Sequence, residues 1–217
     1  MSRGPFSIPA ERLPETLPIF PLSGAVLLPF GRLPLNVFEP RYLNLVDDAL
    51  GNCRLFGMVQ PQAGAAEHSL FRVGCAGRIV HLEESGDGRY LLALEGVCRF
   101  EIKDESLAPG GYRRARVDWS RFIQDLEAPS ASTGLDAAAF LESTRTALAA
   151  QGFAIDDSTL GRMDTGTLVD LFGMQLPLSP ADKQAVLEAA TVAERADVML
   201  ALLRMRAPGV GARETRH

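Results

Sequence analysis

The feature of this sequence that most constrains its fold is a change in the spacing of apolar residues, slightly past the middle of the chain. Before the change, short apolar or alternating runs are separated by Gly and Pro, which is typical of β-strands. After it, apolar residues recur at helical spacing. The stretch in between, 126–134, is rich in Pro, Ser and Gly and predicts a linker. We therefore expect a flexible lead-in over 1–16, a β-rich domain over 17–125, a helical domain over 135–206 and a flexible tail over 207–217.

Apolar runs in the first part predict strands over 17–22, 33–38, 54–60, 71–83, 90–102 and 112–122. Between the fourth and fifth runs, Asp87-Gly88 supplies the positive φ that a tight turn needs, so we expect these two strands to pair antiparallel. A helix is expected over 40–51, with Pro40 at its first position and Gly51 at its end. Short strands with one amphipathic helix predict a small, partly closed barrel.

Helices are expected in the second part over 135–151 and 164–172, and from positions near 180 and 192 onward. Ser179 and Thr191 are the expected N-cap residues of the last two helices, and Gly173 is expected to end the second. Helices this short are marginal on their own. We therefore expect them to pack against one another or against the β-rich half.

The composition and motifs argue against several classes of function. The net charge is −5, so the chain has no bulk positive field for nucleic acid or anionic lipid. The phosphate-binding G-x-x-x-x-G-K-[ST] loop, the G-x-S-x-G elbow and the H-E-x-x-H motif are missing. Its cysteines and histidines do not fall at ligand spacing, so neither a disulfide framework nor a zinc site is expected. Ser179 and Lys183 are spaced as a Ser–Lys dyad, but an N-cap explains the serine better. We expect no enzymatic activity, no cofactor and no metal.

The most apolar N-terminal stretch, 17–30, is a candidate for a membrane-spanning helix or a signal peptide. It is too short for a membrane-spanning helix and is interrupted by Pro18, Pro21 and Pro29. The same prolines argue against a signal peptide. We therefore expect a cytoplasmic protein that does not insert into the membrane.

Several runs, taken in order, resemble a known family, the N-terminal substrate-binding domain of Lon proteases. They are Leu17-Pro-Ile-Phe-Pro-Leu22, Val26-Leu-Leu-Pro29, Leu33-Pro-Leu-Asn-Val-Phe-Glu-Pro-Arg-Tyr42, Gly77-Arg-Ile-Val80, the Asp87-Gly88 turn and Gly96-Val-Cys-Arg-Phe100, followed by Gln184, Leu187 and Arg195. The resemblance covers about 13–206. It implies an α+β fold, a β-rich PUA-like pseudo-barrel followed by a C-terminal helical bundle.

The same resemblance carries the expected function. The family's ATPase and protease domains are missing from this sequence, which is similar to stand-alone members of the family. It therefore implies a non-enzymatic module that binds unfolded or extended polypeptide segments or a partner protein, in an apolar groove or at an open sheet edge. The candidate polypeptide-binding residues, chosen for their place near the family pattern, are Leu33, Leu35, Phe38, Tyr42, Phe56 and Met58. Plain core positions are the alternative interpretation of these residues.

Further residues that match the family pattern are expected to be structural: Glu39, Arg41, Gly96 and Arg99. Gly96 allows a bend in its strand. Glu39 and Arg41 are expected to pair with other charges, for example Arg99, and so to lock the helix onto the barrel.

An alternative function is RNA binding by a PUA-like module. The strand that carries Arg113 and Arg121 mixes guanidinium groups with aromatic rings, as nucleic-acid grooves do. A half-buried strand with a charged outer face explains the same pattern without a ligand, and the net charge disfavours nucleic acid. We therefore regard nucleic acid as the less favoured partner.

Overall fold

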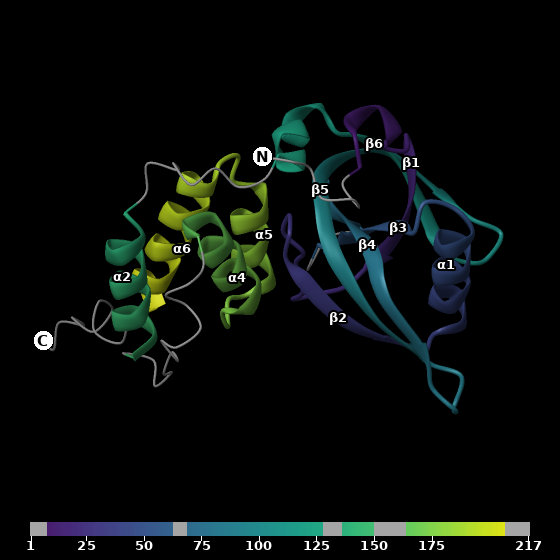
Figure 1. Cartoon of the computed structure of the whole chain (residues 1–217), viewed down its shortest axis with the longest axis horizontal. Helices are drawn as coiled ribbons and strands as arrows, with labels where there is room; N and C mark the ends of the chain where they lie inside the picture. The colour runs from purple at the N-terminus through teal and green to yellow at the C-terminus, as the bar shows by residue number, and fades with distance from the viewer. Residues whose placement is uncertain (1–7, 63–68, 128–135, 150–163, 207–217) are drawn as a thin grey trace, which may run out of the picture.

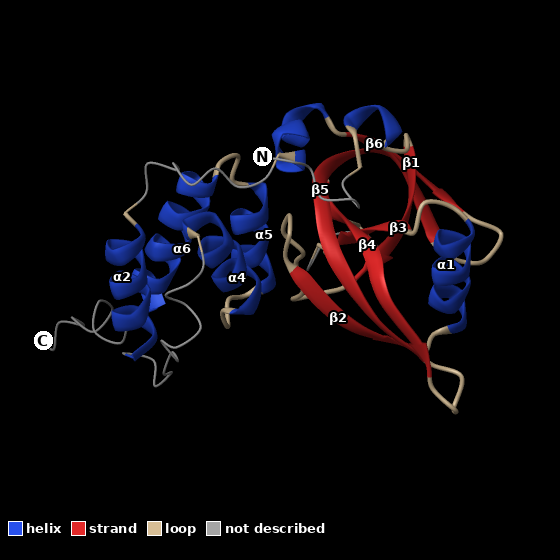
Figure 2. Cartoon of the chain, viewed as in Figure 1, coloured by secondary structure: helices blue, strands red, loops and turns tan. Residues whose placement is uncertain are grey.

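The computed structural model describes residues 8–62, 69–127, 136–149 and 164–206. A β-barrel formed by the first part of the chain lies beside a group of helices formed by the second part (Figure 1, Figure 2). The helix α1 (Pro40–Gly51) lies on the side of the barrel away from that group (Figure 1). This is the α+β fold that the resemblance implied, a β-rich pseudo-barrel followed by a helical bundle.

The described part of the chain contains a six-stranded sheet, made of β1 (Thr16–Pro21), β2 (Arg32–Val37), β3 (Leu55–Val59), β4 (Val73–Glu84), β5 (Tyr90–Leu107) and β6 (Arg113–Asp118). The strand order is β2-β5-β4-β3-β1-β6, and β6 also pairs with β5, which closes the barrel. β1 and β3 are parallel, whereas the other paired strands are antiparallel. β2 pairs with the first half of β5 outside the closed ring and forms an edge.

The barrel interior is an apolar cluster to which every strand of the closed ring contributes alternate residues. Its buried members are Leu17, Ile19, Leu55, Val59, Ala76, Phe100, Ile102, Ala115 and Val117. Gly57 and Gly74 leave room for the Phe100 ring, because a Cβ on either glycine would lie 2.6 or 2.8 Å from Phe100 Cζ. The small interior is therefore filled by side chains and holds no channel.

Helix α1 covers part of the outer face of the barrel. Its buried residues are Tyr42, Leu45, Val46 and Ala49, which lie on one face, as expected of an amphipathic helix. The Tyr42 ring stacks on Phe20 of β1 with 4.3 Å between centroids, and Phe20 stacks in turn on Phe56 of β3. The expected bounds 40–51 and the position of Pro40 in the first turn are confirmed.

The described helices of the second part are α2 (Ala137–Ala149), α4 (Thr165–Gln175), α5 (Pro180–Glu188) and α6 (Val192–Arg206). α6 contacts α2, α4 and α5 and so lies at the centre of the group. One apolar cluster runs from these helices through Leu27 and Leu28 to the outer face of the barrel. The helices therefore share a core with the β-rich half.

The predicted capping residues and the predicted hairpin are confirmed. The hydroxyl oxygens of Ser179 and Thr191 accept hydrogen bonds from backbone N–H groups in the first turns of α5 and α6, at 3.2 and 3.1 Å. In the β4–β5 hairpin, Gly88 has a φ of +77° and donates its N–H to the Ser85 carbonyl at 2.9 Å.

Gly173 does not end α4, contrary to expectation, because the helix continues to Gln175. A Cβ at Gly173 would lie 3.0 Å from Val186 of α5 and 3.1 Å from Leu28. Gly173 therefore lets α4 pack closely against α5 and Leu28. The glycine is needed for this packing and not to end the helix.

Two strand ends also differ from expectation. β5 extends beyond 102 to Leu107, because its second half pairs with β6. The expected strand over 112–122 ends at Asp118, whose carboxylate accepts the Ser120 N–H at 2.9 Å, and the 3₁₀ helix η2 (Ser120–Leu126) follows.

The domain boundaries 17–125 and 135–206 stay predictions. Most of the expected linker, the expected tail over 207–217 and the first part of the expected lead-in lie outside the described residues. Within 8–16 the lead-in contains a short 3₁₀ helix, η1 (Ala10–Arg12).

Candidate functional site

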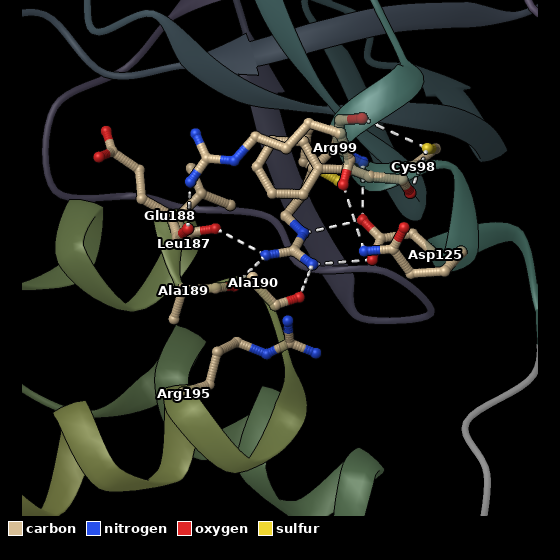
Figure 3. A network of polar contacts seen from close by, with 12 residues as sticks. Cys98, Arg99, Asp125, Leu187, Glu188, Ala189, Ala190 and Arg195 are labelled. Atoms are coloured by element: carbon tan, nitrogen blue, oxygen red, sulfur yellow. Dashed lines mark hydrogen bonds and ion pairs between the residues drawn. The ribbon is translucent and has the colours of Figure 1, made fainter.

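A buried ion pair stands at the junction between the barrel and the helices. Arg99 of β5 is 0% exposed and donates from Nε and Nη2 to the two carboxylate oxygens of Asp125 in η2, each at 2.8 Å (Figure 3). Such two-point pairing fixes direction as well as distance. Phe122 lies under the guanidinium, with Cζ 4.3 Å from the ring centroid.

The remaining N–H groups of Arg99 bind the end of α5. Nη1 donates to the carbonyls of Leu187 (3.0 Å) and Ala189, and Nη2 donates to that of Ala190 (3.1 Å) (Figure 3). The last carbonyls of a helix have no partner within it and carry its partial negative charge, so a cation is favourable there. All five guanidinium N–H groups thus have an acceptor, and one side chain joins β5, η2 and α5.

A second buried pair, Arg195 with Asp170, joins α6 to α4. Arg195 Nε donates to Asp170 Oδ1 at 2.8 Å, and Nη2 donates to Oδ2 at 3.4 Å. Burial raises the pKa of the Asp170 carboxyl to about 6, against the opposing attraction of Arg195. Arg195 Nη1 is buried without a hydrogen-bond acceptor among the described residues.

Two glutamines make a third connection between the halves. Gln60, at the end of β3, donates from Nε2 to Gln184 Oε1 of α5 (3.1 Å) and to the Pro180 carbonyl (2.9 Å). Gln184 in turn donates to the Val73 carbonyl of β4 at 3.1 Å. Together with Arg99, these bonds hold α5 on the barrel, so hollows at the junction have fixed walls.

The loop 29–31 lies within this junction. Phe30 has a φ of +61° and is 46% exposed, although it is neither Gly nor Asn. Its N–H donates to the Gly96 carbonyl at 2.8 Å, and the Gly96 N–H donates to the Gly31 carbonyl at 2.9 Å. A Cβ on Gly96 would overlap the Leu28 carbonyl oxygen. Gly96 thus lets the loop approach β5, while its expected role in bending the strand stays a prediction.

Two hollows share Pro29, Phe30 and Asp170 in their walls. One, of about 160 Å³, is also lined by Gly31, Arg32, Thr167, Leu171, Met174 and Gln175. The other, of about 250 Å³, is also lined by Arg99, Gln124, Asp125, Glu127, Ala190, Thr191, Val192 and Arg195. We call this pair of hollows with Phe30 the junction groove.

The structure does not bring the six candidate polypeptide-binding residues together. Phe56 and Met58 are 0% and 2% exposed and belong to the core, so they form no surface in this conformation. This corrects the expectation that they line an open groove: Phe56 stacks on Phe20, which in turn stacks on Tyr42 of α1, the helix that contacts β3. Leu33 and Leu35 are half-buried on β2, and Phe38 is exposed beneath the Arg89 guanidinium.

Tyr42 is buried and lines a separate hollow. This hollow, of about 360 Å³, lies where α1 meets the ends of β1, β5 and β6, and its walls include Pro21, Arg41, Tyr42, Pro61, Leu70, Leu107, Gly111, Tyr112 and Arg113. We call it the α1 pocket. Of the six candidates, only Tyr42 lines one of these hollows among the described residues.

The expectation that Glu39 or Arg41 pairs with Arg99 is wrong. Glu39 and Arg41 pair with each other at 2.8 Å, and their side chains are 44% and 52% exposed. Arg99 instead points toward α5, on the side of the barrel that is remote from α1 (Figure 1, Figure 3). The barrel and the helices are therefore held together by Arg99 and Asp125. Arg41 forms a surface ion pair at the start of α1.

Two arginines of the segment proposed for RNA are paired with carboxylates. Arg113 pairs with Glu105 and Arg121 with Glu101, at 2.8 and 2.9 Å. Carboxylates that face these guanidinium groups oppose an approaching phosphate. The arrangement is that of a charged outer strand face.

The Ser–Lys hypothesis gains no support from the geometry. Ser179 Oγ donates to the Asp182 carboxylate at 2.7 Å, while Lys183 Nζ donates to the Met174 carbonyl at 2.9 Å. The lysine is therefore turned away from the serine, which serves as the N-cap of α5. Across the described ranges, no three His, Cys, Asp or Glu side chains cluster as metal ligands would.

Sequence reasoning missed Phe30 and Asp125. Phe30 follows an apolar run and precedes Gly31, a pattern that also fits an ordinary turn. Asp125 is flanked by Gln124 and Leu126 and is followed by Glu127, so the local sequence does not distinguish it as a buried counter-charge.

Comparison with known proteins decides the family. The family model described as the ATP-dependent protease La (LON) substrate-binding domain matches residues 16–205. The chain belongs to this family. Lon protease 2 of Sorangium cellulosum is 32% identical to it over 219 aligned positions, 92% of this chain and 26% of that protein.

Solved structures of Lon N-terminal domains agree with this fold. A Lon N-terminal domain protein from Xanthomonas campestris has a TM-score of 0.62 and 26% identity, covering 86% of this chain and 97% of that chain. The N-terminal domain of a Mycobacterium avium complex Lon protease has a TM-score of 0.66 at 18% identity, covering 88% and 99%. The chain spans about a quarter of the length of the curated Lon proteases it matches.

Within the described ranges, each helix falls short of the length and apolarity that a membrane span needs.

Proposed function

We propose that this LON substrate-binding domain binds extended polypeptide segments without altering them chemically, and that the junction groove is where they bind. The observation that carries this proposal is Phe30, a half-exposed aromatic ring held at positive φ between two hollows. Backbone strain of this kind persists only where surrounding contacts impose it, and it gathers at binding sites. The family assignment supports a polypeptide as the ligand.

The groove offers what an extended segment needs. Phe30, Leu171 and Met174 give an apolar surface for one side chain, and the Gln175 amide can donate to and accept from a peptide backbone. Covering the exposed half of a Phe side chain is worth about 1 kcal/mol. The hydrogen bonds through Gly96 hold the loop in place beforehand, so little ordering entropy is lost on binding.

Strand addition at β2 is a weaker alternative. β2 is an edge strand, but its exposed Pro34 has no N–H to donate to an added strand. Proline on an edge is a common protection against such pairing. The groove is therefore the better supported site.

Binding of a long unstructured peptide to Phe30→Ala tests this proposal. The peptide carries a neutral fluorophore, contains apolar but no acidic residues, and has an amidated C-terminus. We expect fluorescence anisotropy to show binding to the wild type and about fivefold to tenfold weaker binding to Phe30→Ala. Leu91→Ala, at an exposed apolar residue of the β4–β5 hairpin, is the control and should bind like the wild type.

Phe30→Gly separates binding from stability. Glycine accepts positive φ freely, so this variant should melt at or above the wild-type temperature and still bind weakly. If Phe30→Ala and Phe30→Gly bind the peptide as tightly as Leu91→Ala does, the junction groove is not the binding site.

A further inference from the structure

The α1 pocket is lined by residues of α1 and of the strand ends beside it, and it shares no lining residue with the junction groove. Four parts of the chain surround it: the end of β1, the first turn of α1, the bridged pair Pro61 and Leu70, and the connection from β5 to β6. Leu107 is an exposed apolar residue on its rim. A hollow walled on several sides by separate segments admits a chain end more readily than a continuing strand.

Cationic groups line this pocket beside apolar ones. Arg41 lies over the Tyr42 ring, with Cζ 4.6 Å from its centroid, and Arg113 lines the same hollow. Their carboxylate partners, Glu39 and Glu105, do not line it. Both arginines are thus wall residues, whereas the two glutamates, at 2.8 Å from the guanidinium nitrogens, are not.

The charges of both arginines also act on the Tyr42 hydroxyl. Burial raises its pKa, while the positive charges of Arg41 and Arg113 act to lower it and Glu39 acts to raise it. Both arginines are therefore close enough to influence one atom at the wall of the pocket. The other nearby acid, Asp48, is engaged by the Tyr112 hydroxyl.

We propose that the α1 pocket binds the C-terminal residue of a polypeptide, with the free α-carboxylate at Arg41 and Arg113 and an apolar side chain against Leu107 and Tyr112. A C-terminal residue carries a carboxylate and a side chain on one carbon. One residue can therefore contact both the cationic and the apolar parts of the lining. Each arginine keeps N–H groups beyond those used by its glutamate. Those exposed pairs are weak, so a carboxylate competes with them at little cost.

The pocket's size fits this ligand. A volume of about 360 Å³ exceeds what a carboxylate alone fills and lies at the lower end of ligand pockets. Gly111 has a φ of +81°, and a Cβ there would contact Arg41 Cβ at 3.6 Å. That distance is ordinary van der Waals contact, so the glycine is required by the backbone turn between β5 and β6 and not by the space beside Arg41. This inference rests on the proposed function only in taking the ligand to be a polypeptide.

A set of short peptides tests the proposal on the full chain. One ends in a free Leu carboxylate, the second ends in a Leu carboxamide, and the third is amidated but contains an internal Asp. We expect calorimetric titration to show at least about tenfold tighter binding of the free acid than of the other two, as loss of a charge-assisted contact implies. Raising the salt concentration should narrow this difference.

The double variant Arg41→Gln, Arg113→Gln should bind the acid no better than the amide. Arg116→Gln, at an exposed arginine of the same strand β6, is the matched control and should keep the preference. The proposal would be overturned if the wild type bound the free acid no better than the carboxamide or the internal Asp peptide. It would also be overturned if the double variant kept the full preference for the free acid. A thermal melt confirms that the double variant is folded.

The two proposed sites can be tested independently of each other. Phe30→Ala should keep the preference for the free acid, and the double arginine variant should keep its affinity for the long amidated peptide. Loss of acid preference in Phe30→Ala would show that only one site exists, and would overturn the assignment of the carboxylate to the α1 pocket.

Discussion

Arg99 and Asp125 are 26 positions apart and meet as a two-point ion pair, with Asp125 also accepting the backbone N–H of Arg99 at 3.1 Å. The pair fixes β5 against η2, and the remaining guanidinium N–H groups hold the end of α5. The barrel, the connection that follows it and the helices therefore meet at one side chain. The walls of the junction groove depend on that meeting point.

We expect Asp125→Asn to lower the free energy of unfolding by about 3–5 kcal/mol, because a buried guanidinium loses its counter-charge. Arg99→Lys should cost a similar amount, since one ammonium cannot reach the carboxylate and three carbonyls together. Urea unfolding measures both. Arg121→Lys, at the exposed arginine over the same Phe122 ring, is the control. A loss below about 1 kcal/mol for Asp125→Asn would show that the pair does not hold the halves together.

The exposed pair of Glu39 and Arg41 should behave differently. Each single alanine variant should change the free energy of unfolding by under about 1 kcal/mol, because water and salt screen a surface pair. Thermal melts at low and high salt measure this. A loss of several kcal/mol in either variant would restore the interpretation that these residues lock α1 onto the barrel.

Local patterns predicted the elements of this fold well. Alternating runs and Asp87-Gly88 located the strands and the hairpin, and the caps at Ser179 and Thr191 located two helix starts, because these features depend on nearby residues. The parallel pairing of β1 with β3 and the closure of β5 on β6 depend on contacts between distant segments. No local pattern specifies those contacts.

The candidate sites were less predictable, since exposure depends on which elements cover a strand. Phe56 and Phe38 are both aromatic residues near the family pattern, yet one is in the core and the other is on the surface. Arg99 was expected to be structural, but its partner Asp125 is supplied by η2, a 3₁₀ helix that the sequence did not predict. The role proposed for Phe30 rests on a backbone angle that no composition rule reports.

We expect a fragment from residue 135 onward to lack a cooperative thermal transition. In the full chain Leu28 packs on Gly173, Arg99 satisfies the last carbonyls of α5, and Gln60 bonds to Gln184. The fragment loses all three, and helices this short are marginal without partners. Far-UV circular dichroism with a thermal scan makes the measurement, and the full chain is its control. A sharp two-state melt of the fragment would show that the helices form an independent domain.

Asp170 should make stability depend on pH in an unusual direction. Burial raises its pKa to about 6, whereas the carboxyl of an unfolded chain titrates near its ordinary 3.8. Between about pH 4 and pH 6 the native state therefore binds more protons than the unfolded state, and this residue's contribution to the free energy of unfolding falls as the pH rises. Above about pH 7 the loss levels off at about 3 kcal/mol.

Asp170→Asn removes this titration while keeping a group of the same shape beside Arg195. We expect the free energy of unfolding of the wild type, minus that of Asp170→Asn, to decrease between about pH 4 and pH 6 and then to stay constant. Subtracting the variant cancels the opposite contribution of carboxyls such as Asp118, whose pKa is lowered to about 2 by its bonds to Ser120 and Lys103. Urea titrations at several pH values measure the difference. If it increases with pH over this window, attraction by Arg195 outweighs burial and the carboxylate is the favoured form throughout.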